Sequence, residues 1–213
     1  DLEVLFATAG TASNALALSV LAAPDSMILC HDEAHIQRDE RGAPEFFTGG
    51  AKLLPLPGDH AKISPDALTR ALAEWPEDFV HATPPQVLSI SQLNESGCAY
   101  TLGEIETLAG LAHDAGLLVH MDGARFSNAL VRLNCSPADM TWKAGVDALC
   151  VPTIPTFYGR ADLVADGIGP NSRLGTYTNF VNLLGLCGLA VPMPARRDGR
   201  PGSVTLLASD GRD

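Results

Sequence analysis

Two side chains near the middle of the chain have the types and spacing to bind a small ligand. Asp122 and Arg125 are three residues apart in the stretch Asp-Gly-Ala-Arg, which follows the apolar run 117–121. A carboxylate just beyond a buried strand can meet a ligand from a rigid support, and a guanidinium can hold a ligand carboxylate through two parallel hydrogen bonds. The alternative is that Asp122 caps the following helix or lies at the surface.

A second candidate is the stretch Gly10-Thr11-Ala12, which opens the apolar segment 11–22. The free N–H groups and the positive dipole end of a helix N-terminus suit a phosphate. The hydroxyls of Thr11 and Ser13 add hydrogen-bond donors. Ordinary capping of the helix by Thr11 is the alternative.

A third candidate is the histidine pair His31 and His35, four residues apart. This spacing is typical of a helical zinc pair. However, Asp32 stands where such a motif has glutamate, the segment follows a strand and is expected to be a loop, and no third ligand is evident. We therefore predict no metal site. A structural or surface pair and a role in stacking on a ligand both stay open.

The elements that must position these residues alternate between strand and helix through the first 150 residues. We predict strands at 2–6, 26–30, 53–56, 87–91, 117–121 and 146–151, and helices at 11–22, 64–75, 101–115, 125–133 and from 136. Ser64-Pro65 has the pattern of a helix N-cap, and Thr101 with Glu104 has the spacing of a capping box. The alternation indicates βαβ units, and therefore an α/β fold with a mostly parallel sheet.

Composition sets limits on the function and divides the chain in two. The formal net charge is −11, no basic block occurs, and no apolar run is long enough to span a membrane, so we expect no nucleic-acid or membrane partner. Five widely spaced cysteines without a C-x-x-C pair predict reduced thiols in a cytoplasmic protein. Glycine and proline make up 15 of the last 63 residues, well above the usual share of about 12%. We therefore place a domain boundary near residue 150.

Five segments carry a resemblance to the low-specificity threonine aldolases: Gly10–Leu16, Cys30–Ile36, 45–52, His120–Phe126 and 136–146. These are pyridoxal-phosphate (PLP) enzymes of the beta-eliminating lyase group with the aspartate-aminotransferase-like fold. The resemblance implies that residues 1–149 form part of a PLP-dependent transferase-like large domain. It also implies self-association into a homo-oligomer.

The resemblance implies a role for each candidate. Asp122 would pair with the pyridine nitrogen of PLP and keep it protonated, so that the ring can accept electrons. His35 would stack on the ring, and the stretch from Gly10 to Ala12 would cradle the phosphate. Arg125 would hold the carboxylate of an amino-acid substrate, and with His35 it is a candidate catalytic residue. The implied reaction cleaves a β-hydroxy-amino acid, such as threonine to glycine and acetaldehyde.

One residue that the resemblance requires is missing. Enzymes of this fold hold PLP as a Schiff base with a lysine, which in threonine aldolases follows the strand that begins here at Val146. No lysine follows Lys143, and Lys143 itself is expected at the surface. We therefore expect the lyase activity to be impaired, with PLP held noncovalently or lost.

The rest of the chain resembles another family. The string 168–184 looks like the carboxyl-side portion of allophanate hydrolase, an amidase-signature enzyme, so residues 150–213 are expected to be an amidase-like, glycine- and proline-rich tail. No Ser-Ser-Lys arrangement of the amidase kind is evident in the sequence. The alternatives to an aldolase are therefore an amide-hydrolase fragment and a non-catalytic chimeric or truncated product.

Overall fold

The computed structural model describes residues 10–75, 81–152, 186–192 and 203–209. The chain divides into two compact units, one of residues 14–149 and one of residues 1–13 with 150–213. The strand predicted at 2–6 lies outside the described residues.

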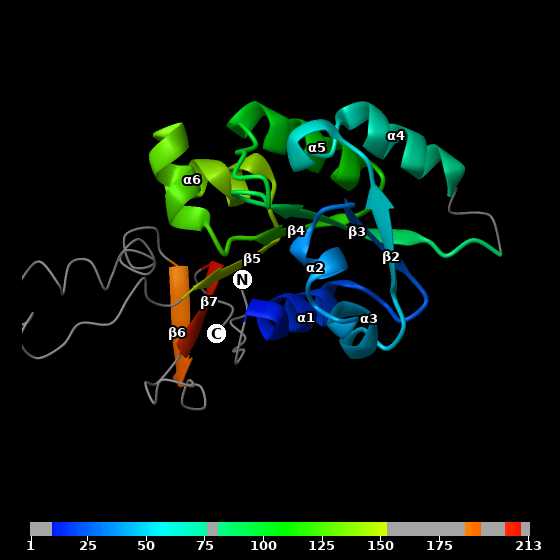
Figure 1. Ribbon diagram of the computed structural model, residues 1–213, viewed down its shortest axis with the longest axis horizontal. Coiled ribbons are helices and arrows are strands. Elements are labelled where there is room, and N and C mark those ends of the chain that lie inside the picture. Colours follow the sequence, from blue (N-terminus) through cyan, green and yellow to red (C-terminus); the bar gives the residue numbers. More distant parts are fainter. Residues whose placement is uncertain (1–9, 76–80, 153–185, 193–202, 210–213) are drawn as a thin grey trace, which may run out of the picture. The chain divides into compact units, whose positions relative to one another are not determined.

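A parallel sheet forms the centre of the 14–149 unit (Figure 1). Its strands are β1 (Met27–His31), β2 (Lys52–Leu56), β3 (Pro85–Ser91) and β4 (Leu118–Asp122). Their order is β2-β1-β3-β4, and every neighbouring pair is parallel. The register sets Asp122 beside Ser91 and His31 beside Leu56, so the carboxyl ends of the four strands share one edge of the sheet.

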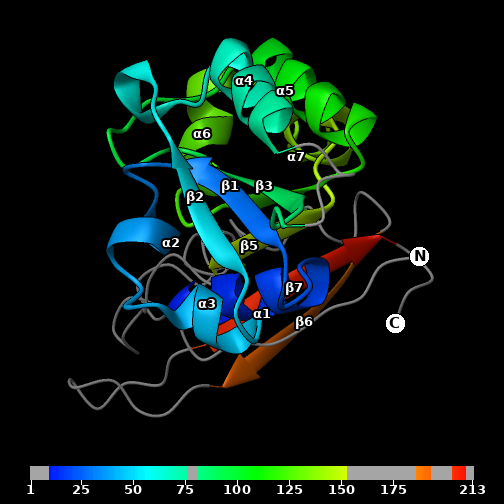
Figure 2. The same ribbon diagram turned by 90° about the vertical axis from the view of Figure 1, so that its right-hand side faces the viewer.

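Helices cover both faces of this sheet, as βαβ connections require. The α-helices are α1 (Gly10–Leu21), α2 (His35–Arg38), α3 (Ala43–Phe47), α4 (Pro65–Glu74), α5 (Leu102–Asp114), α6 (Phe126–Leu133) and α7 (Pro137–Met140), and the 3-10 turns are η1 (Asp59–Ala61) and η2 (Trp142–Ala144). Figures 1 and 2 both show α4 and α5 on one face and α1 and α3 on the other. The predicted α/β class with a mostly parallel sheet is confirmed.

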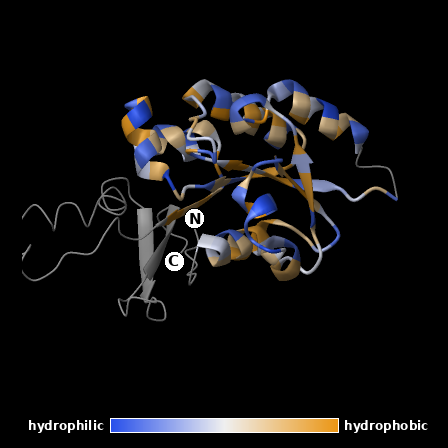
Figure 3. Cartoon of the chain, viewed as in Figure 1, coloured by the Kyte–Doolittle hydropathy of each residue, from blue (hydrophilic) through white to orange (hydrophobic). Residues whose placement is uncertain are grey.

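Apolar burial holds these layers together. On the α1 face, Leu18 and Ala22 form a buried cluster with Ile28, Cys30 and Val87 of β1 and β3. On the other face, α5 buries four residues, Ile105, Leu108, Ala109 and Ala112. Figure 3 shows hydrophilic and hydrophobic residues alternating along α4 and α5, as amphipathic surface helices require.

Local signals in the sequence fix where helices begin. Ser64 Oγ accepts a hydrogen bond from the backbone N–H of Ala67 at 3.1 Å and caps α4. Thr101 and Glu104 form the predicted capping box of α5. The predicted N-termini of α4 and α5 are therefore confirmed, and each such cap is worth about 1 kcal/mol.

Three local predictions need correction. Asp122 is the last residue of β4 rather than the first residue after the strand. The segment expected to be a loop begins with His31 at the end of β1, and His35 opens the short helix α2. The helix α3 is not foreseen, because five residues are too short to show helical periodicity.

The second unit contains an antiparallel arrangement. Strand β5 (Ala148–Pro152) pairs through its last three residues with β7 (Ser203–Ser209), and β7 pairs along its length with β6 (Leu186–Pro192). The predicted strand at 146–151 is confirmed, shifted by one to two residues. The amidase-like character of the tail stays a prediction, and the string 168–184 lies outside the described residues.

Candidate functional site

The carboxylate of Asp122 is buried and held in place at the carboxyl end of β4. The residue is 7% exposed. Oδ1 accepts a hydrogen bond from the backbone N–H of Ala124 at 2.9 Å, and Oδ2 accepts one from Nδ2 of Asn14 at 2.9 Å. A carboxylate has about four acceptor positions, so Asp122 can still accept a donor from a ligand.

Asn14 connects Asp122 to a second buried carboxylate. Its Nδ2 donates to Oε1 of Glu40 at 2.8 Å as well as to Asp122, and both Asn14 and Glu40 are almost completely buried. One neutral amide group therefore lies between two acidic side chains that come from different parts of the sequence. Sequence reasoning missed this role of both Asn14 and Glu40.

His35 completes the network through Glu40. Its Nδ1 lies 2.8 Å from Oε1 of Glu40, and its side chain is 38% exposed while that of Glu40 is buried. Burial lowers the pKa of His35, but the hydrogen bond and the negative charge of Glu40 outweigh this and raise it above its ordinary value. Burial raises the pKa of Glu40, against the hydrogen bonds from Asn14 and His35. The proton shared between His35 and Glu40 is therefore held on the imidazole more firmly than in a free histidine.

The same three side chains could be considered as metal ligands. One ligand atom each from His35, Glu40 and Asp122 lie within 4.8 Å of one another. In this structure, however, the Asn14 amide donates a hydrogen bond to both carboxylates. One oxygen of each carboxylate is therefore satisfied without a cation. We therefore interpret the group as a hydrogen-bonded network, and the absence of a metal stays a prediction.

Arg125 stands at the N-terminus of α6 and projects partly into solvent. Its side chain is 43% exposed, and its Nη1 donates to the backbone oxygen of Leu93 at 3.3 Å. The same nitrogen lies 3.7 Å from Oε1 of Glu95. The guanidinium can therefore still receive a ligand carboxylate. Glu95 is a further residue of this region that the sequence did not single out.

The predicted phosphate-binding residues begin helix α1. Gly10 is exposed and Thr11 and Ala12 are half-buried. A Cβ built on Gly10 meets nothing within 4 Å, so the fold itself does not require glycine there. These three residues belong to the unit of residues 1–13 and 150–213, and their role stays a prediction.

None of the three lysines is an obvious replacement for a Schiff-base lysine. The Lys62 amine binds both carboxylate oxygens of Glu104, at 2.6 and 2.7 Å. Lys143 is 61% exposed and pairs with Asp139 at 2.9 Å, which confirms its predicted surface position. Lys52 is exposed and begins β2 opposite Met27, at the amino-terminal edge of the sheet, whereas Asp122 lies at the carboxyl-terminal edge.

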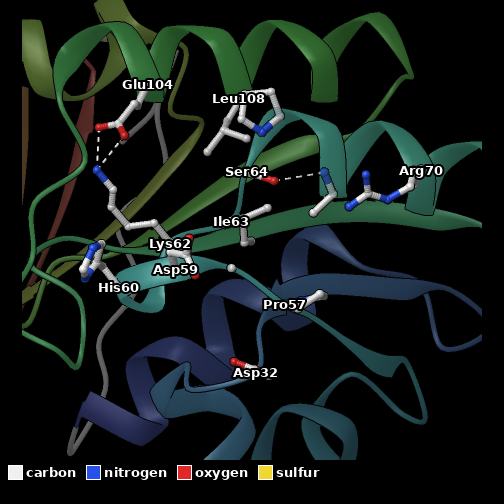
Figure 4. Close-up of a pocket in the computed structure, with 13 residues that line it drawn as sticks. Asp32, Pro57, Asp59, His60, Lys62, Ile63, Ser64, Arg70, Glu104 and Leu108 are labelled. Carbon is white, nitrogen blue, oxygen red and sulfur yellow. Dashed lines mark hydrogen bonds and ion pairs between the residues drawn. The ribbon is translucent and has the colours of Figure 1, made fainter.

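A pocket of about 700 Å³ is lined mainly by the segment from Pro57 to Arg70, and its lining includes neither Asp122 nor any residue of its hydrogen-bonded network. Its lining is Asp32, Pro57, Gly58, Asp59, His60, Lys62, Ile63, Ser64, Pro65, Ala67, Arg70, Glu104 and Leu108 (Figure 4). The Lys62 amine, drawn toward Glu104 in Figure 4, is already neutralised. The hollow therefore adds no group to the network around Asp122.

Among the described residues, no helix is long and apolar enough to cross a membrane.

Comparison with known proteins identifies the family. The sequence profile of the beta-eliminating lyase family matches residues 2–153, so the chain belongs to this family. A low specificity L-threonine aldolase of Pseudomonas sp. (strain NCIMB 10558) is 45% identical over 150 residues, which are 70% of this chain and 43% of that protein. The chain thus spans less than half the length of this relative.

Two further comparisons bear on the fold and the tail. A solved threonine aldolase of Leishmania major aligns with 100% of this chain and 80% of its own, at 18% identity and a TM-score of 0.65, which supports the fold alone. The urea amidolyase of Lachancea kluyveri is 45% identical over 75 residues, 35% of this chain and 4% of that protein. Both resemblances stated from the sequence are therefore confirmed.

Proposed function

We propose that the chain binds PLP noncovalently at Asp122 and His35 and accepts an amino acid at Arg125. It would do so as a member of a lyase family that cleaves β-hydroxy-amino acids. The observation that carries the proposal is the Asp122 carboxylate, which is buried at the carboxyl end of a parallel strand and held by Asn14 and Ala124. Ligands of open α/β sheets bind at this edge.

The fixed charge of Asp122 suits a pyridine nitrogen. A carboxylate held by two donors loses little freedom when a ligand N–H becomes its third partner, and its charge favours the protonated ring. PLP, when bound, supplies an electron sink for the carbon next to the amino group. The buried, hydrogen-bonded carboxylate of Asp122 therefore fits the protonated ring nitrogen of the cofactor.

His35 and Arg125 complete the proposed site. Glu40 fixes one nitrogen of His35 and leaves the partly exposed ring face available for stacking on the cofactor. Arg125 would bind the α-carboxylate of a threonine-like substrate through two parallel hydrogen bonds. Gly10, Thr11 and Ala12 remain the predicted phosphate ligands.

Without the Schiff-base lysine, we expect the chain to bind the cofactor but to turn substrate over very slowly. Without a lysine after Lys143, the chain lacks the group that exchanges the cofactor between protein and substrate. Loss of such a covalent group costs several orders of magnitude in rate. We therefore expect a chain that binds the cofactor but converts threonine to glycine and acetaldehyde very slowly. No described residue favours the amide-hydrolase alternative.

A titration with PLP tests the proposal. We expect Asp122→Asn to weaken binding by about tenfold or more, because the charge that pairs with the ring nitrogen is lost. Asp114→Asn, at the exposed end of α5, is the matched control and should bind as the unmodified chain does. Equal binding by Asp122→Asn would refute the proposal.

Borohydride reduction followed by mass spectrometry tests the noncovalent part. We expect no single lysine to carry a pyridoxyl group. Stoichiometric labelling of Lys52, Lys62 or Lys143 would show that another lysine has been recruited and that the expected loss of turnover is wrong.

A further inference from the structure

Glu95 is a half-buried carboxylate beside Arg125 to which the proposed function gives no role. It lies on the loop between β3 and α5, and its side chain is 18% exposed. Its Oε1 is 3.7 Å from Nη1 of Arg125, too far for a hydrogen bond but within ion-pair distance. The carboxylate therefore stands directly next to the proposed carboxylate clamp.

The oxygen that faces Arg125 is an unsatisfied acceptor. Oε1 of Glu95 is shielded from solvent and has no hydrogen-bond partner within the described residues. A buried acceptor without a donor is costly, and that cost is recovered when a ligand supplies the donor. A hydroxyl group is the simplest donor that a small amino acid can bring to this position.

The charges around Glu95 support a place inside the site. Burial raises the pKa of Glu95, and the negative charge of Asp122 adds to this, while its own backbone N–H, the charge of Arg125 and the Ser91 hydroxyl oppose it. The charges of both Asp122 and Arg125 therefore act on the Glu95 carboxylate. These are the two groups that would hold the ring nitrogen and the carboxylate of a bound amino acid.

We propose that Glu95 accepts a hydrogen bond from the β-hydroxyl of an amino acid held at Arg125, and so selects β-hydroxy-amino acids. The inference rests on the proposed function. In such a ligand the carboxylate and the hydroxyl are borne by neighbouring atoms of the Cα–Cβ unit, so a group next to the carboxylate clamp is within reach of the hydroxyl. A site that hydrogen-bonds a ligand hydroxyl rejects analogues that lack it, because the acceptor is left unpaired.

Two stable ligands test this without any turnover. They are the reduced, fluorescent adducts N-(5′-phosphopyridoxyl)-L-threonine and N-(5′-phosphopyridoxyl)-L-2-aminobutyrate, which differ in the β-hydroxyl and need no lysine to bind. We expect the unmodified chain to bind the threonine adduct about tenfold more tightly, as one hydrogen bond to a charged acceptor allows.

Variants of Glu95 then assign the preference to this side chain. Glu95→Leu should reduce the preference to about twofold or less, and Glu95→Gln should retain part of it, because its carbonyl oxygen still accepts. Glu106→Leu, an exchange at an exposed position of α5, should keep the full preference. The graded series separates recognition of the hydroxyl from a general loss of packing.

The outcomes distinguish the two proposals. Equal binding of the two adducts by the unmodified chain, or an undiminished preference in Glu95→Leu, would overturn the role of Glu95 and leave the proposed function standing. Failure of pyridoxamine 5′-phosphate and of both adducts to bind would overturn the proposed function, and the role of Glu95 with it.

Discussion

The side-chain amide of Asn14 donates a hydrogen bond to Asp122 at 2.9 Å across 108 positions of the sequence. The bond joins helix α1 to the carboxyl end of β4. Because the same amide also donates to Glu40, its two hydrogens keep two buried carboxylates apart. A neutral amide therefore holds the Asp122 carboxylate in place.

Replacing this amide by a carboxylate should destabilise the site strongly. Asn14→Asp would bring a third carboxylate into contact with Glu40 and Asp122 in a buried position. We expect the free energy of unfolding to fall by about 3 kcal/mol or more at neutral pH. The fall should be smaller at pH 5, because burial raises the pKa of Glu40 and its protonation relieves the repulsion. Urea denaturation at the two pH values measures this.

A matched exchange controls for the added charge. Asn128→Asp lies at an exposed position in the first turn of α6 and should change the free energy of unfolding by about 0.5 kcal/mol or less. If Asn14→Asp were equally mild, the bridge between the two carboxylates would not exist.

The pair His35 and Glu40 predicts a raised histidine pKa that depends on one carboxylate. The His35 pKa lies above 6.5 because of Glu40, so the folded chain binds this proton more tightly than the unfolded chain. The corresponding stabilisation is complete below pH 6.5 and is lost as pH rises through the raised pKa.

Nuclear magnetic resonance of the histidine rings checks this directly. We expect Glu40→Gln to lower the pKa of His35, because the charge that stabilises the imidazolium is removed. Glu33→Gln, which removes the exposed partner of Arg38, should leave the titration of His35 where it is. An unchanged His35 pKa in Glu40→Gln would show that the contact is absent in solution.

His120 predicts the opposite pH dependence. It is fully buried, its Nδ1 lies 2.9 Å from the Ser89 hydroxyl, and burial lowers its pKa to about 4 despite the nearby charge of Asp122. The unfolded chain therefore binds more protons than the folded chain between pH 4 and 6.5. The contribution of His120 to stability should be present above pH 6.5 and disappear as pH falls toward 4.

The difference in the free energy of unfolding between the unmodified chain and a His120 variant isolates this effect. We expect His120→Gln to be less stable at pH 7, because the packed ring is lost, and the gap between the two chains to narrow toward pH 4.5. Urea denaturation across this range provides the curve. A gap that stays constant with pH would mean that His120 takes up a proton in the folded state as readily as in the unfolded state.

The elements of the fold could largely be predicted, because their signals are local. Thr101 and Glu104 are three residues apart, and the side chain of each accepts a hydrogen bond from the backbone N–H of the other. Four consecutive residues are therefore enough to predict where α5 begins. The apolar run before Asp122 places this carboxylate at the end of a strand to within one residue. The family resemblance then supplied roles for residues whose individual patterns were weak.

The polar network could not be predicted, because its contacts are distant in sequence. Asn14, Glu40 and Glu95 are ordinary polar residues until the sheet brings them next to Asp122, His35 and Arg125. The one local signal was an acidic residue five positions after His35. The four-residue helix α2 was missed as well, since one turn carries no periodicity.

Gly145, the residue after η2, lies against helix α5. Its φ is +91°, and a Cβ there would lie 2.7 Å from the Cβ of Ala109. Gly145→Ala should therefore lower the free energy of unfolding by about 1–3 kcal/mol, through backbone strain and a clash with the helix.

Gly110→Ala is the control, because Gly110 lies within α5 with nothing within 4 Å of an added Cβ. It should raise stability by about 0.5–1 kcal/mol. Urea midpoints measure both, and an unchanged midpoint for Gly145→Ala would contradict this packing of the turn on α5.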